Sequence, residues 1–122
     1  MTHRTYVFTN MYLEGIRAGV QGAHAVARLV SDYPDTASTI FDIDETMIFL
    51  QGGESNDLLD LCLQLRTRGI PFREFHEPGL GDACTAVAAF LPMRIFDDLP
   101  LTEDGGGMDP LGARIKSMRL TS

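Results

Sequence analysis

Gly19-Val-Gln-Gly-Ala-His-Ala25 has the pattern of a helix that begins close to the end of a strand. A second stretch, Phe75-His-Glu-Pro-Gly-Leu-Gly-Asp-Ala-Cys-Thr-Ala-Val-Ala88, has the pattern of a polar, glycine-rich loop that leads into an apolar strand. A helix that packs on a sheet and a strand inside that sheet are the units of an α/β domain. The two stretches therefore predict both the class of the fold and a site where the helix meets the loop.

The first half of the chain predicts strand, helix and strand. Tyr6-Val-Phe8 reads as a short strand, residues 31–36 predict a stop and a loop, and Thr46-Met-Ile-Phe-Leu50 reads as an interior strand covered on both faces. Glycines at 15, 19 and 22 would weaken an isolated helix by roughly 1 kcal/mol each, so the helix between these strands needs close packing on a sheet. This helix, residues 14–33, is indicated by apolar or small residues at a spacing of three and four: Ile16, Val20, Ala23, Ala27 and Val30.

The second half predicts helix, strand and strand. Residues 51–56 form a turn with good N-cap residues, an amphipathic helix follows, and Gly69 has the usual place of a C-cap glycine. Phe72-Arg-Glu-Phe75 alternates like a third strand, and Thr85-Ala-Val-Ala-Ala-Phe-Leu91 is an apolar fourth strand. This order of elements predicts a three-layer α/β/α domain with a small four-stranded mixed sheet over residues 1–95.

The last part of the chain has a different character. Residues 97–110 are acidic and glycine-rich, which is typical of a linker, and residues 114–119 are a short basic piece of a C-terminal tail. We assign residues 96–122 to this linker and tail. The tail is expected either to be disordered or to dock on another copy of the chain, and the composition favours disorder.

Composition limits the classes of function. With 122 residues, 44% apolar and 22% charged, the chain is one ordinary globular domain, and no apolar run approaches the ~20 residues that span a bilayer. We expect it to stay in the cytoplasm, away from membranes and without a cofactor. The net charge of −7 weighs against generic nucleic-acid binding, although a local basic patch can still form. Cys62 and Cys84 have no metal-site spacing and are expected to be buried apolar side chains.

The two opening stretches resemble the active-site segments of the type 2 peptidyl-tRNA hydrolase family. Members of that family carry a lysine and then Gln-x-x-His-Ala along the first helix, and here Arg17, Gln21, His24 and Ala25 stand in those places. The arginine keeps the positive charge of the lysine but replaces a point charge by a planar fork. Contact with a phosphate or an oxyanion is compatible with that exchange, whereas delivery of a proton by lysine is not.

The second family segment is matched less closely. Glu77 stands at the position of the family aspartate, Gly81 takes the place of the loop threonine, and the loop is about two residues shorter. Either Asp82 or Thr85 is therefore a candidate to present a polar group at the same point. The Thr85-Ala-Val-Ala88 sequence resembles the family strand, and its combination with the preceding Glu77-Pro-Gly-Leu80 resembles a divergent branch of the family, of the kind found in phage and bacterial proteins.

The resemblance implies cleavage of the ester between a peptide and the terminal ribose of tRNA. That reaction needs a positioned water, a base and donors to the oxyanion. Glu77 is the candidate base or water-positioning group, and Arg17 and the amide of Gln21 are candidate donors. His24 is as readily a hydrogen-bonded structural histidine as a catalytic one, and Thr85 reads more readily as a strand residue with a satisfied hydroxyl. Family members commonly form dimers, so a homodimer is expected.

Two alternatives remain open. Asp42-Ile-Asp-Glu-Thr46 resembles the first motif of haloacid-dehalogenase-like phosphatases, in which Asp42 would attack phosphorus, Asp44 would handle the leaving-group proton and both would surround Mg²⁺. That motif should follow an apolar strand of four or five residues, and only Ile40 and Phe41 precede it here, which favours a plain acidic lead into the strand at residues 46–50. The other alternative is a catalytically inactive binding or assembly module on the same scaffold.

Overall fold

A computed structural model describes residues 2–97 and 107–122 of the protein. It confirms the predicted class, an α/β domain with a four-stranded mixed sheet and helices packed around it. Within the described ranges, no helix combines the length and the apolar character that crossing a membrane requires. In chain order the elements are β1 (His3–Asn10), α1 (Gly15–Asp32), α2 (Pro34–Ile43), β2 (Met47–Gly53), α3 (Ser55–Thr67), β3 (Phe72–Glu77), the 3₁₀ turn η1 (Pro78–Leu80), β4 (Ala83–Pro92), the 3₁₀ turn η2 (Met93–Phe96) and α4 (Pro110–Lys116).

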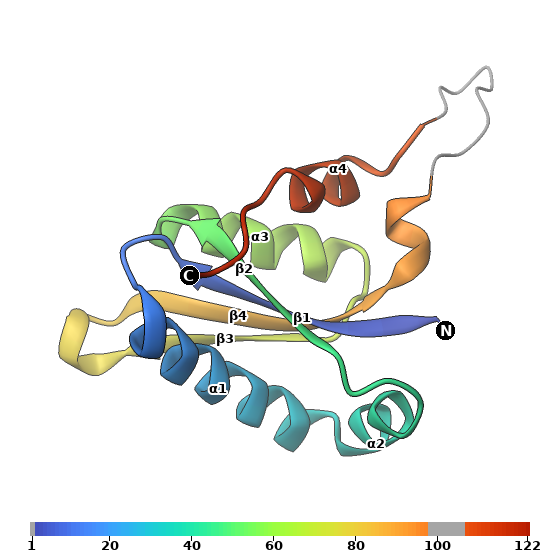
Figure 1. Ribbon diagram of the computed structural model, residues 1–122, viewed down its shortest axis with the longest axis horizontal. Coiled ribbons are helices and arrows are strands. Elements are labelled where there is room, and N and C mark those ends of the chain that lie inside the picture. The colour runs from blue at the N-terminus through green and yellow to red at the C-terminus, as the bar shows by residue number, and fades with distance from the viewer. Residues whose placement is uncertain (1, 98–106) are drawn as a thin grey trace.

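The sheet has the strand order β2-β1-β4-β3. β1 and β2 are parallel, whereas β4 runs antiparallel to both of its neighbours, β1 and β3. α1 and α2 cover one face of the sheet, and α3 and α4 cover the other, which gives three layers (Figure 1). The central strand β4 is buried along nearly its whole length, because its apolar run packs against helices on both faces.

The face that α1 turns to the sheet differs from the row of residues that indicated the helix. The buried positions are Ala18, Gly22, Ala25 and Leu29, whereas Ile16 is 83% exposed and Val20 is 46% exposed. A Cβ atom on Gly22 would lie 2.5 Å from Cε2 of Phe49 and 2.9 Å from Cγ1 of Val7. Small residues therefore let the helix approach the strands closely, and the larger apolar side chains of its first half remain at the surface.

β2 is an edge strand and not the interior strand that its apolar run predicts. Its outer edge is covered by the C-terminal segment of the same chain, since Gln51 N–H donates to Arg119 O at 2.8 Å and Thr121 N–H donates to Phe49 O at 3.0 Å. The expectation of a disordered tail, or of one that docks on another copy, is wrong for residues 107–122. α4 also buries Leu111 and Ile115 in the core that α3 forms with the sheet. Residues 98–106 of the predicted linker lie outside the described part of the chain.

The stretch expected to be a loop after α1 contains a further helix. Pro34 stands in the first turn of α2, where its missing N–H is tolerated, and Asp35 adds an acidic side chain to the same turn. Asp42 lies in the last turn of α2. The phosphatase reading needs Asp42 at the end of an apolar strand, so the fold does not supply the context of that motif.

Candidate active site

The candidate site lies where the first turns of α1 meet the end of β3, the η1 loop and the start of β4. Phe75 pairs with Ala86 and His76 pairs with Cys84, so Thr85 is the extra residue of a β-bulge in β4. Bulges often occur beside functional sites because they re-aim a side chain at the edge of regular pairing. The bulge here presents the buried Thr85 side chain to α1.

A chain of hydrogen bonds joins three segments that are far apart in sequence. The Thr85 hydroxyl donates to Oε1 of Gln21 at 2.7 Å, and Nε2 of Gln21 donates to Oε2 of Glu77 at 3.0 Å. The Thr85 hydroxyl also lies 3.3 Å from the carbonyl oxygen of Phe75. A carboxylate accepts hydrogen bonds only, so the nitrogen of the Gln21 amide must face Glu77 and its oxygen must face Thr85. Both ends of the Gln21 amide are thereby fixed.

Glu77 is a half-buried carboxylate at the end of β3. The hydrogen bond from Gln21 is the largest cause of a pKa below the ordinary value, and a further hydrogen bond from the backbone N–H of Gly79, 3.3 Å from Oε1, acts in the same direction. The nearby imidazole of His24 lowers this pKa slightly. Glu77 is therefore ionised at neutral pH and well suited to orient a water molecule.

Arg17 lines the same cavity as Gln21 and Glu77, although sixty residues separate Arg17 from Glu77 in sequence. The cavity has a volume of about 610 Å³. Arg17 and Gln21 lie one helical turn apart on α1, so their side chains form one row along the helix. The cavity thus brings a guanidinium, an amide and a carboxylate to one wall.

His24 and Asp82 occupy other places in this region. The exposed imidazole of His24 stacks on Phe75, with ring centroids 4.6 Å apart and planes inclined by 10°, and the guanidinium of Arg28 lies 5.4 Å from the centroid of the same ring. Asp82 has a positive φ of 59° and contributes backbone bonds, since its N–H donates to Glu77 O and its O lies 2.9 Å from Nδ1 of His76. The backbone bonds of Asp82 hold the η1 loop. Neither the His24 nor the Asp82 side chain takes part in the series of hydrogen bonds from Thr85 through Gln21 to Glu77.

The rest of the cavity wall is apolar and was not predicted. Side chains of the β1–α1 loop, of α1 and of η1 form it, the half-buried Leu13 and the exposed Tyr12, Ile16, Val20 and Leu80. Two hydrogen bonds hold Tyr12 in place. Its hydroxyl donates to Oε1 of Glu54 at 2.5 Å, and its backbone N–H donates to Oδ1 of Asn10 at 3.0 Å. The sequence did carry a signal, since Gly and Ala at 18, 22 and 25 already offered a complete sheet-facing row on α1.

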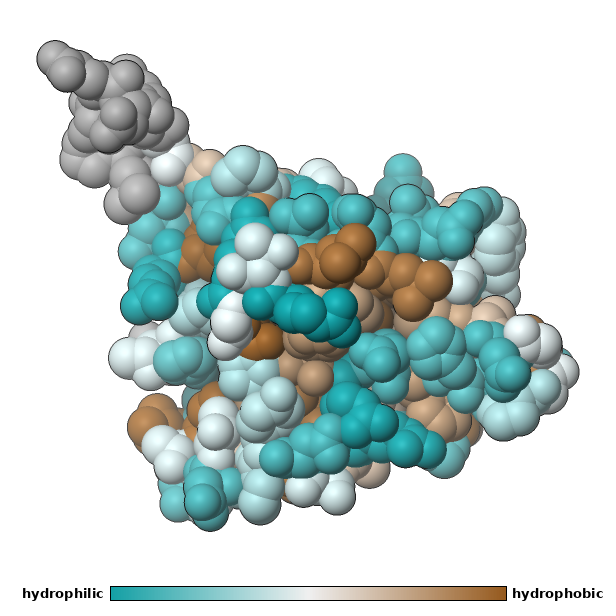
Figure 2. All heavy atoms as spheres, turned by 180° about the vertical axis from the view of Figure 1, so that it is seen from behind, coloured by the Kyte–Doolittle hydropathy of each residue, from teal (hydrophilic) through white to brown (hydrophobic). Residues whose placement is uncertain are grey.

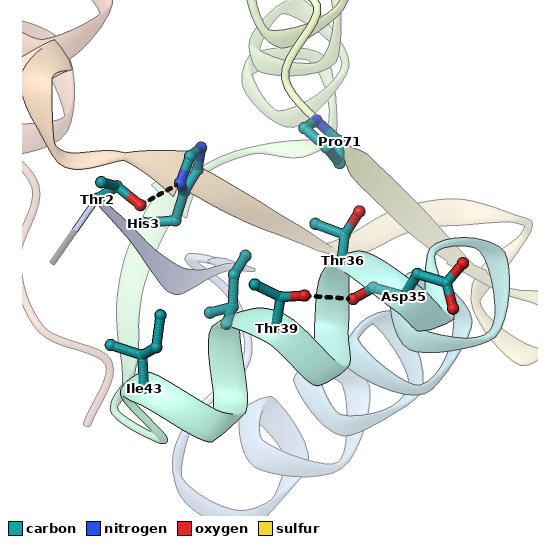
Figure 3. Close-up of a pocket in the computed structure, with 8 residues that line it drawn as sticks. Thr2, His3, Asp35, Thr36, Thr39, Ile43 and Pro71 are labelled. Atoms are coloured by element: carbon teal, nitrogen blue, oxygen red, sulfur yellow. Dashed lines mark hydrogen bonds between the residues drawn. The ribbon is translucent and has the colours of Figure 1, made fainter.

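A second cavity, of about 420 Å³, lies at the opposite end of the sheet, where α2 meets the start of β1 (Figures 1 and 3). Its polar groups bond locally, as the Thr2 hydroxyl lies 3.0 Å from Nδ1 of His3 and Thr39 donates to the carbonyl oxygen of Asp35 at 3.0 Å. Neither Asp42 nor Asp44 is among its lining residues.

Asp44 is held by structural partners. Thr46 donates through its side chain and its backbone N–H, Arg4 Nε donates at 3.0 Å, and these bonds hold the pKa of Asp44 at about 2. Among residues 2–97 and 107–122, no group of three or more His, Cys, Asp and Glu side chains is arranged to hold a metal ion. Cys62 and Cys84 are free and buried, as predicted, and burial raises the pKa of their thiols to about 12 and about 11.

In comparisons with known proteins, the sequence matches no family model and no curated protein.

Proposed function

We propose that the cavity beside Glu77 binds and hydrolyses an ester between a peptide and tRNA, in the manner of the type 2 peptidyl-tRNA hydrolases that the sequence resembles. The observation that carries this proposal is the hydrogen-bonded chain from Thr85 through Gln21 to Glu77 at the edge of a cavity that Arg17 also lines. Gln21 and Glu77 are matched to the resembled segments independently in sequence, and their contact in space supports a common role.

Each group has a defined part in the proposed reaction. Glu77 accepts a hydrogen bond from water and aims the water oxygen at the ester carbonyl. The amide nitrogen of Gln21 carries two N–H groups, of which one donates to Glu77 and the other is the candidate donor to the oxyanion. The guanidinium of Arg17 adds positive charge for the oxyanion or for the nearby phosphate.

The atoms of the step balance without an oxidant or a further reactant. The water oxygen bonds to the carbonyl carbon, and the carbon–oxygen bond to the ribose breaks. One proton from water passes by way of Glu77 to the ribose oxygen, and the products are a peptide carboxylic acid and tRNA. Because the pKa of Glu77 is lowered, its strength as a base is modest, and its larger contribution is to position the water.

The direct test is incubation of the pure protein with N-acetylaminoacyl-tRNA, followed by measurement of deacylated tRNA. Glu77→Gln should abolish most of the release, and Glu45→Gln, at an exposed position after α2, is the matched control. Hydrolysis that is unchanged in Glu77→Gln would contradict the proposed site. A parallel phosphatase assay with and without Mg²⁺ tests the alternative through Asp42 and Asp44.

A second candidate function is binding without catalysis. The acidic side chains of this region favour it, because Glu77 lines the cavity together with Arg17, Glu14 precedes the first residue of α1, and Glu54 accepts a hydrogen bond from Tyr12, which also lines the cavity. Acidic side chains repel a phosphate backbone, whose affinity depends on clustered cations. Saturable ligand binding in a protein that fails to release tRNA from any acyl ester would favour this module.

A homodimer and a cytoplasmic location belong to the same proposal; the dimer follows from the resemblance, and the location follows from the composition. The mass of one chain is 13.4 kDa, so light scattering separates a monomer from a dimer directly. A mass near that of one chain would remove the dimer from the proposal and leave the site intact.

A further inference from the structure

The cavity beside Glu77 combines a polar wall with an apolar wall that belongs to the surface of α1 and η1. Ile16 and Val20 lie one helical turn apart, as do Arg17 and Gln21, so the helix presents an apolar row next to a polar row. Ile16 is 83% exposed, Tyr12 71%, Leu80 54% and Val20 46%. Large apolar side chains that gather around one cavity at such exposure mark a place where an apolar group binds.

Tyr12, which forms one part of the apolar wall, is held in place before any ligand arrives. Tyr12 is fixed at both ends, by the bond from its hydroxyl to Glu54 and by the bond from its N–H to Asn10. Asn10 in turn donates from Nδ2 to the carbonyl oxygen of Cys84 at 3.1 Å, which ties the β1–α1 loop to the start of β4. A preformed wall loses little conformational freedom on binding, which favours a small ligand.

The polar wall decides which part of a ligand faces which side. Leu80 follows Glu77 by three residues in the η1 turn, and Val20 precedes Gln21 directly, so the apolar side chains lie beside the polar ones that would hold the reacting carbonyl. We propose that the apolar wall of Tyr12, Ile16, Val20 and Leu80 is a pocket for the side chain of an N-acylamino acid. The pocket selects amino acids with a large apolar side chain over glycine. This inference rests on the proposed function, which places the reacting carbonyl beside Glu77. The preference for an apolar side chain is a separate claim.

The test uses two simple probes, N-acetyl-L-phenylalaninamide and N-acetylglycinamide, with nuclear magnetic resonance of the isotope-labelled protein. The phenylalanine probe should cause saturable shift changes at Ile16, Val20 and Leu80, and the glycine probe should cause at most weak ones. Ile16→Ser and Val20→Ser each remove most of one exposed apolar contact and should weaken binding of the phenylalanine probe by about tenfold.

A matched control comes from the other side of the sheet. Apolar side chains also gather over the middle of the face seen from behind in Figure 2. On α3, Leu63 is 55% exposed and does not line the cavity beside Glu77, so Leu63→Ser removes an exposed apolar side chain of similar size elsewhere. Leu63→Ser should bind the phenylalanine probe like the unaltered protein.

Each outcome decides between the pocket and its rivals. Equal binding of the two probes, shifts confined to other regions, or equal losses in Ile16→Ser and Leu63→Ser would overturn the pocket. A dimer that becomes a monomer in Ile16→Ser would also overturn it, because a second copy would then cover the wall.

Hydrolysis separates this inference from the proposed function. N-acetylphenylalanyl-tRNA should be cleaved about tenfold faster than N-acetylglycyl-tRNA at low substrate concentration, and Ile16→Ser should remove the difference. Equal cleavage of both substrates would contradict the pocket and support the hydrolase proposal. Selective probe binding without cleavage of either substrate would contradict the hydrolase proposal and support the pocket.

Discussion

Two acidic regions at opposite ends of the sheet both resemble catalytic motifs in sequence and differ in their surroundings. Asp44, just after α2, and Glu77, the last residue of β3, are both half-buried carboxylates whose pKa values are lowered by hydrogen bonds. Asp44 receives its bonds from Thr46 and from the cation Arg4, with which it forms an ion pair. The hydrogen bonds that hold Glu77 come from the neutral groups of Gln21 and Gly79.

The hydrogen-bond partners, rather than a match to a motif, distinguish the structural carboxylate of Asp44 from the candidate catalytic carboxylate of Glu77. The Arg4 guanidinium offsets the charge of Asp44 and ties the α2–β2 connection to β1, a role that is complete within the fold. Glu77 keeps its charge at the wall of a cavity that also contains a guanidinium and an apolar surface. Matched substitutions in the two regions test whether this difference in partners decides activity and stability.

The largest expected effect is on turnover. Glu77→Gln keeps the shape of the side chain and removes its charge, so ester hydrolysis should fall by about a hundredfold or more, the range for a positioned acid–base group. The fall should be in kcat more than in KM. Asp42→Asn should leave the same activity unchanged. The measurement is the initial rate of tRNA release, and a Mg²⁺-dependent phosphatase activity lost in Asp42→Asn would reverse the ranking of the two regions.

The second effect concerns the guanidinium in the cavity. Arg17→Ala should weaken hydrolysis or tRNA binding by about 1.5 to 3 kcal/mol, roughly 10- to 150-fold, because it removes a charged hydrogen-bond donor. Stability should change little, since the side chain is exposed. Arg66→Ala is the control, because Arg66 lies over Phe72 on the far side of the sheet, 5.3 Å from the ring centroid. Equal losses in both variants would indicate a general effect of charge.

The order of the strands and helices was accessible from sequence because periodicity and turn residues report them directly. The alternating run at β3, the apolar run at β4 and the glycine that ends α3 appear where they were expected; Gly69, with φ of 67°, directly follows the C-cap residue Arg68. The edge position of β2 and the presence of α2 could not be predicted in this way, because they depend on tertiary contacts. An apolar run does not distinguish an interior strand from an edge that the chain's own C-terminal segment covers, and α2 begins at a proline that reads as a loop signal.

The sequence predicted only part of the candidate site, because the remaining part also depends on tertiary contacts. Gln21 and Glu77 could be proposed from the resemblance, but the place of Thr85 beside Gln21 depends on the bulge in β4, which no local pattern indicates. The apolar wall was missed because Ile16 and Val20 fit the helical period, and a period alone does not say which face meets the sheet. The clash that a Cβ atom at Gly22 would make gives the physical answer.

The third effect is on stability and belongs to Asp44. Its folded pKa of about 2 lies below the ordinary value of 3.8, so its ionised form stabilises the folded state at pH values above 3.8. That contribution is lost as the pH falls through about 2. Asp44→Asn should therefore lower the melting temperature at pH 7 and lower it less at pH 2, while hydrolysis is retained. A difference in melting temperature that is the same at both pH values would show that the charge of Asp44, held by Thr46 and Arg4, is not its cause.

The smallest effect is a shift in one titration. Gln21 is the largest cause of the lowered pKa of Glu77, so Gln21→Leu should move that pKa upward toward the ordinary value of 4.5, with the Gly79 bond left to hold part of the shift. The carboxyl carbon resonance of Glu77, followed from pH 7 to pH 3, measures this directly. The Asp44 resonance in the same spectra is an internal control and should not move between variants, since its partners are Thr46 and Arg4. A Glu77 titration that is identical in both proteins would mean that the contact with Gln21 is absent in solution, and with it the observation on which the proposed site depends.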